Sequence, residues 1–184
     1  MRKMFLCMLV VTAVSTGFVS VSGAMEAYLW VDGAPGEVAL NEPAYKDWIA
    51  VQSFSWGHKL QPSGTTSSPR VQFDVLSIVK FLDKASSPLA LSCANGRSIP
   101  RVVLELRGGP GQKPFEKIEL QQVLVTSYDM ESPPSQPLST LPRPIEKVSF
   151  TFARILWTYT VLDATGTPRA EVKSGWDIGS LKGM

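Results

Sequence analysis

Runs of alternating apolar and polar residues dominate this sequence, and a period of two places successive side chains on opposite faces of a β-strand. In Arg101–Arg107, for example, every second residue from Val102 to Leu106 is apolar. Turn-forming pairs such as Asp32-Gly33 separate the runs. The predicted strands are Ala27–Val31, Trp48–Leu60, Val71–Leu82, Arg101–Arg107, Phe115–Tyr128 and Glu146–Leu162.

The alternation is interrupted at two places inside these strands. The adjacent polar residues Gln121 and Gln122 indicate a bulge. Near Arg154 the spacing of apolar residues changes by one, which indicates a second bulge or a corner. On either side of it we expect one face to be buried, formed by Val148, Phe150, Phe152, Ile155, Trp157, Tyr159 and Val161.

One short α-helix is predicted between the third and fourth strands. Ser87 can serve as its N-cap, Pro88 suits the first helical position, and Asn95-Gly96 supplies a left-handed end. Leu89, Leu91 and Ala94 are expected to face a sheet. The predicted fold class is therefore mainly β, a compact antiparallel β-barrel of two packed sheets with one short α-helix.

The N-terminus has the layout of a secretory signal peptide. Arg2 and Lys3 precede an apolar run, Met4–Val14, and small residues end at Ala24. The run is shorter than the roughly 20 residues that span a bilayer, and no later segment is long and apolar enough to do so. We expect cleavage after Ala24, a mature domain of residues 25–184 without a membrane span, and a secreted or periplasmic location. Alternatively, Met25 is the true start and the protein is cytoplasmic before secretion.

The residue counts argue against several classes of function. The net charge is +2, from 18 basic and 16 acidic side chains, and it falls to about zero without Arg2 and Lys3, so no nucleic-acid partner is expected. His58 is the only histidine, and Cys93 would be the only cysteine of the mature chain. Gly108–Gly111 precedes a strand, unlike a phosphate-binding loop. We therefore expect no catalytic residue, no metal site, no cofactor and no enzymatic activity.

Seven short segments, in the same order along the chain, resemble the haemolysin-coregulated protein (Hcp) family, the inner-tube proteins of bacterial type VI secretion systems. The matching segments are Ala27–Gly33, Trp48–Gly57, Asp83–Ser86, Cys93–Gly96, Lys117–Leu120 with Val123–Tyr128, Glu146–Phe150 and Gly175–Asp177. The resemblance implies a homo-hexameric head-to-tail ring. Such rings stack into a tube that a contracting sheath expels with a spike and effector proteins. Family members are usually made without a signal peptide, so residues 1–24 depart from the pattern.

The same resemblance implies a ring-stacking role for one loop, which in the family projects toward the next ring. Its residues are Gln61, Pro62, Ser63, Gly64, Thr65, Thr66, Ser67, Ser68 and Pro69. None is charged, and all except Gln61 are Ser, Thr, Gly or Pro, as expected for an exposed loop. A solvent-exposed connection without a partner is the alternative.

Two functions are open from the sequence. The first is a structural tube protein. The second is a periplasmic or secreted binding module that holds a ligand or partner through the ring or a tryptophan-rich surface. The N-terminal residue of the natural protein, together with the compartment that contains it, would distinguish them.

Overall fold

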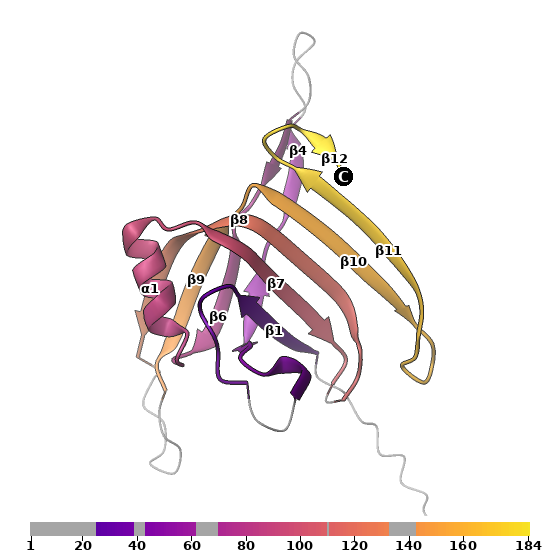
Figure 1. The fold of residues 1–184 in the computed structure, drawn as a ribbon, viewed down its shortest axis with the longest axis horizontal. Helices are drawn as coiled ribbons and strands as arrows, with labels where there is room; N and C mark the ends of the chain where they lie inside the picture. Colours follow the sequence, from indigo (N-terminus) through magenta and orange to yellow (C-terminus); the bar gives the residue numbers. More distant parts are fainter. Residues whose placement is uncertain (1–24, 39–42, 62–69, 110, 133–142) are drawn as a thin grey trace, which may run out of the picture.

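Two antiparallel sheets share one long strand, β8, in the computed structural model (Figure 1). The structure describes residues 25–38, 43–61, 70–109, 111–132 and 143–184. Sheet A has the strand order β12-β11-β10-β8-β7-β1-β2, and sheet B joins β8 to β9, β6 and β3. A separate hairpin pairs β4 with β5.

The strands are β1 (Glu26–Val31), β2 (Ile49–Val51), β3 (Ser53–Ser55), β4 (His58–Gln61), β5 (Arg70–Phe73), β6 (Leu76–Phe81), β7 (Ile99–Arg107), β8 (Pro114–Glu131), β9 (Ile145–Thr151), β10 (Arg154–Leu162), β11 (Pro168–Asp177) and β12 (Lys182–Gly183). The helices are the 3-10 helix η1 (Pro43–Tyr45) and α1 (Ser86–Asn95). The fold is therefore mainly β with one α-helix in the described part of the chain, as the sequence predicts.

Strand β8 changes sheets at Gln122, which has the left-handed backbone angle φ 52°. Before this residue β8 pairs with β7 and β10; after it Val123 still pairs with Ile99 of β7, and from Leu124 on β8 pairs with β9. On the facing chain the corner lies between β9 and β10, where the Ala153 N–H donates to the Gln121 carbonyl at 3.1 Å. Both predicted interruptions, at Gln121-Gln122 and near Arg154, are confirmed as the points where the chain passes between sheets.

Two predicted long strands are wrong in their extent. The segment Trp48–Leu60 forms β2, β3 and β4, because at Gln52 it leaves β1 and its N–H donates to Val79 of β6 at 2.8 Å. The segment Val71–Leu82 is broken at Asp74, whose N–H donates to the Gly57 carbonyl. At both corners the inward apolar positions shift by one, from Ile49 and Val51 to Phe54 and Trp56, and from Val71 and Phe73 to Leu76 and Ile78. The sequence interpretation did not use this shift.

The core lies between the two sheets and includes residues from both. Fully buried members are Leu29, Ile49, Leu76, Ile78, Leu89, Val102, Leu104, Leu120, Phe150 and Ile155. The expected burial of Tyr159 and Val161 is wrong, since they are 49% and 39% exposed. Tyr159 is the last residue of β10 that pairs with β8, and Val161 lies beyond it, where β10 pairs only with β11.

Helix α1 ends as predicted but begins differently. Gly96 is the left-handed C-cap at φ 64°, whereas Ala85 is the N-cap without a side-chain hydrogen bond, so the prediction of Ser87 as N-cap is wrong. Leu89 is buried as expected. The expected burial of Leu91 and Ala94 is also wrong: Leu91 is 63% exposed and Ala94 is exposed.

A closed barrel is not found among the described strands. Strand β2 pairs only with β1, and β3 pairs only with β6, so the two sheets do not share a second continuous strand. Two packed sheets are what the structure establishes. Within the described ranges, no helix has the length and apolar composition that crossing a bilayer requires.

A buried ionic cluster attaches the start of α1 to sheet B. The Lys80 ammonium of β6 lies 2.5 Å from the Glu146 carboxylate of β9 and 2.8 Å from Asp83, and both Lys80 and Glu146 are fully buried. Ser86 of α1 and Tyr128 of β8 also donate to Glu146. Burial alone would raise the pKa of Glu146, but these hydrogen bonds outweigh it and hold the pKa below its ordinary value.

Replacing Lys80 with methionine should therefore destabilise the protein strongly. The substitution leaves two carboxylates without their cation, and breaking a buried pair costs about 3–5 kcal/mol. We expect a loss of that order in the free energy of unfolding, measured by urea denaturation at neutral pH. Lys147→Met, at an exposed position of β9, is the control and should stay within about 0.5 kcal/mol. A Lys80→Met protein as stable as this control would contradict the stabilising role.

Candidate assembly surfaces

The hairpin β4–β5 positions the predicted ring-stacking loop. Residues 62–69 lie outside the described residues, so that prediction stays untested. Gln61 at the end of β4 pairs with Arg70 at the start of β5, which brings the two ends of the loop together. The hairpin projects from the rest of the molecule (Figure 1), and every residue of β4 is exposed.

A stack of aromatic rings attaches this hairpin to sheet A. The imidazole of His58 lies 5.7 Å from the Trp56 ring and 5.2 Å from the Phe73 ring, both in stacked orientation. Trp157 of β10 stacks on Trp56 at 6.0 Å. The rings bury apolar area between the base of the hairpin and sheet A, and this packing holds the base of the hairpin against the sheet.

In the part of the chain that the structure describes, no hydrogen bond or ion pair links His58 or Cys93 to a possible catalytic partner, although His58 shares a shallow hollow with Glu116, Tyr159 and Ser174. The imidazole of His58 is part of the ring stack and makes no hydrogen bond or ion pair with the residues described. Cys93 is a free, half-buried thiol on α1 that packs against the core. The described ranges contain no group of three or more His, Cys, Asp or Glu side chains that could hold a metal ion.

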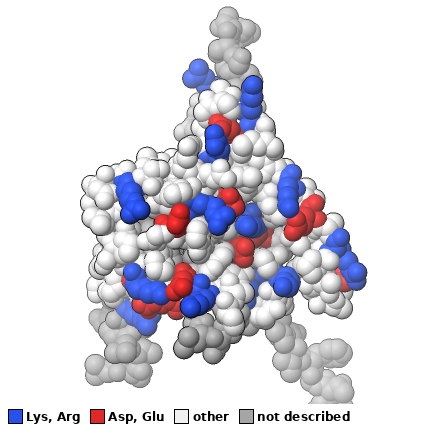
Figure 2. Space-filling view, viewed as in Figure 1, with Lys and Arg blue, Asp and Glu red and all other residues white. Residues whose placement is uncertain are grey.

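Charges of both signs are interleaved on the outer face of sheet A. Figure 2 shows basic and acidic side chains close together across the middle of this face. Glu105 of β7 is paired in register with Lys117 of β8, and Arg154 of β10 lies 2.6 Å from Asp177 of β11. This alternation gives the face no large field of one sign.

A second polar cluster lies at the β1 side of this face and holds η1 against it. The Arg107 guanidinium lies over the Tyr28 and Tyr45 rings, at 4.8 and 4.9 Å from their centroids, and forms an ion pair with Glu26 at 2.7 Å. The Tyr45 hydroxyl donates to Glu105 at 3.0 Å, and burial raises the pKa of Tyr45. Cation–π contacts and hydrogen bonds, not only apolar area, attach this segment.

The sequence of this chain matches one known protein family over most of its length. A family model described as "Type VI secretion system effector, Hcp" matches residues 28–159, well over half of the chain. The fold described above is thus that of a type VI secretion protein. The chain belongs to the Hcp family, as its resemblance in sequence implied.

Individual relatives agree with this assignment. "Protein hcp1" of Pseudomonas aeruginosa is 30% identical over 112 residues, which are 59% of this chain and 66% of that protein. The chain therefore spans slightly less than two thirds of this relative. A solved structure of a type six secretion system protein superposes with a TM-score of 0.77 at 24% identity, over 88% of this chain and all of the other. Hcp1 from Salmonella typhimurium superposes at 0.69 and 23% identity, covering 88% and 99%. These two matches show the shared fold.

The His58 ring is expected to contribute packing and no catalytic chemistry. Because only its ring makes contacts, His58→Phe should keep the stack and leave folding and assembly unchanged, measured by thermal unfolding and native mass spectrometry. His58→Ala, which removes the ring, should lower stability by about 1 kcal/mol without abolishing activity. Loss of biological activity in a folded, assembled His58→Phe protein would contradict the non-catalytic role.

Proposed function

We propose that this protein is a non-enzymatic structural component of a type VI secretion tube. Hexameric rings would stack into the tube and be exported with effector proteins, with a sheath and a spike as further partners. The family match over residues 28–159 is the observation that carries this proposal. The described residues include no group of side chains that could hold a metal ion, which supports a structural role.

The two sheets would complete a barrel in the assembled protein. The N–H of Gln52 donates to Val79 at 2.8 Å, and this contact already joins the end of β2 to sheet B. Closure would leave fewer unpaired strand edges, which otherwise attract other chains.

The loop Gln61–Pro69 is the proposed contact between successive rings. Its ends lie at the tip of the β4–β5 hairpin, which projects from the rest of the molecule (Figure 1) and whose strand β4 is exposed along its whole length. The uncharged Ser, Thr, Gly and Pro residues of the loop would let the rings approach without charge repulsion.

Assembly tests this proposal directly. Sedimentation at tens of micromolar should show a species of about six times the monomer mass, and electron microscopy at higher concentration should show stacks. Replacing residues 62–69 with Asn-Gly, which suits a two-residue hairpin, should keep rings and abolish stacks. A protein that sediments only as a monomer would contradict ring formation. A shortened protein that stacks as readily as the parent, or a parent that never stacks, would contradict the role of the loop.

The proposed location is secreted or periplasmic, with residues 1–24 acting as a signal peptide. Ala24→Leu puts a large side chain at the residue before the proposed cleavage point, where the peptidase requires a small one. A precursor longer by residues 1–24 should accumulate, as seen by intact mass, while Val21→Leu should be processed normally. If both variants begin at Met25, then Met25 is the initiator and the signal-peptide proposal is wrong. If processed protein stays in the periplasm and forms no tube, the alternative binding module is favoured.

A further inference from the structure

The hairpin formed by β10 and β11 carries an uncovered apolar face. Tyr159 and Val161 share the face of the buried Ile155, and Val172 is paired with Tyr159 across the two strands. Val172 is 60% exposed. The opposite face of the hairpin is polar, with Thr158, Thr160, Glu171 and Lys173. Strand β10 pairs with β8 as far as Tyr159, and beyond it only with β11. A two-stranded hairpin is marginal in water, so exposed apolar residues at and beyond Tyr159 indicate a partner.

One carboxylate lies on this apolar face without a partner. Glu116 of β8 is paired in register with Tyr159. Both line a shallow hollow, whose other lining residues are Trp56, His58, Trp157, Val172 and Ser174. Burial raises the pKa of Glu116, and its carboxylate makes no ion pair or hydrogen bond with any other part of the chain that the structure describes. A cation from a partner would restore the interactions that burial removes.

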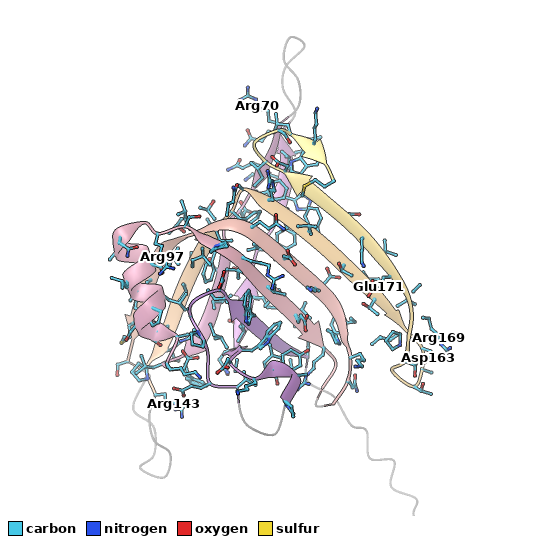
Figure 3. The ribbon with its side chains drawn as sticks, viewed as in Figure 1. Arg70, Arg97, Arg143, Asp163, Arg169 and Glu171 are labelled. Carbon is cyan, nitrogen blue, oxygen red and sulfur yellow. The ribbon has the colours of Figure 1, made fainter. Side chains whose placement is uncertain are left out.

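A second uncovered patch lies on the opposite side of the molecule, at α1. Figure 1 shows α1 at one edge of the fold and the far end of the β10–β11 hairpin at the other. The exposed side chain of Leu91 lines a groove of about 370 Å³ between α1, the turn after β1 and the start of β7. Arg97 also lines this groove. Figure 3 shows Arg97 beside α1, far from Arg169 and Asp163 at the hairpin end.

We propose that the apolar face of the β10–β11 hairpin of one copy packs on Leu91 and the α1 groove of the next copy, with Glu116 pairing with Arg97. The inference rests on the proposed ring and names the surfaces that form it. The two patches differ and lie on opposite sides, which is what a head-to-tail contact that closes into a ring requires. Neither Glu116 nor the Arg97 guanidinium pairs with another described residue, so their charges are available to each other. Asp32, whose carboxylate would repel Glu116, lines the groove on its β1 side. Glu116 of the neighbouring copy is therefore assigned to the α1 side of the groove, where Arg97 lies.

A charge on the apolar face should weaken assembly. In protein purified from cells that express the full chain, Val172→Lys should raise the concentration for half-maximal ring formation at least about tenfold, measured by native mass spectrometry. Glu171→Lys places the same side chain at the neighbouring position on the polar face and should change the concentration for half-maximal ring formation less than about threefold. Both positions are exposed, so thermal unfolding should be unchanged. Equal effects of the two variants would overturn the assignment of this face.

A charge exchange tests the pairing itself. Glu116→Lys and Arg97→Glu should each weaken ring formation about tenfold, because each places like charges together, and the double variant should recover to within about threefold of the parent. Single variants that weaken assembly without recovery in the double variant would overturn the assignment of the α1 groove. If the parent forms rings and no variant affects them, this inference fails while the proposed ring stands. A monomeric parent would overturn both.

Discussion

One residue with a left-handed backbone, Gln122, lets a single strand belong to two sheets. A non-glycine residue in this region costs about 1–2 kcal/mol, and the packing on either side offsets it. Leu120 and Val123, three residues apart, both point into the core because the backbone turns between them. Without this turn one of them would face solvent. The bend thus determines how sheet A and sheet B meet.

The rest of the architecture follows from where the two sheets overlap. Sheet B covers only part of sheet A, so β10 and β11 continue beyond the core and expose apolar side chains such as Tyr159. On the other side, Ser86 joins α1 to the buried Lys80 and Glu146, which keeps the helix in one position against sheet B. The same geometry therefore produces a projecting hairpin at one edge and a fixed helix at the other.

Periodicity was sufficient to predict the strands up to Leu162 and the two interruptions at Gln121-Gln122 and Arg154, and end signals such as Asn95-Gly96 predicted the helix. The sequence interpretation missed β11 and β12, after Leu162. At Gln52-Ser53 the inward apolar positions also shift by one, but alternation is a local property and cannot show which strand the segment pairs with next. Lys80 and Glu146 occupy inward positions of their strands, and this was a signal of a buried ion pair that the sequence interpretation did not use. Burial of Tyr159 was predicted from its face alone, which does not tell whether a second layer of the same chain covers that face. The family resemblance supplied the type VI assignment, which residue chemistry alone did not indicate.

Electron cryomicroscopy of the purified protein tests the central claim, that this chain assembles head to tail through surfaces built into the fold. We expect sixfold rings in which the β10–β11 hairpin of each copy covers α1 of its neighbour and brings Glu116 and Arg97 within ion-pair distance. Monomers alone at tens of micromolar would contradict head-to-tail assembly. Rings that leave Tyr159 and Val172 in contact with water would contradict the assignment of these surfaces.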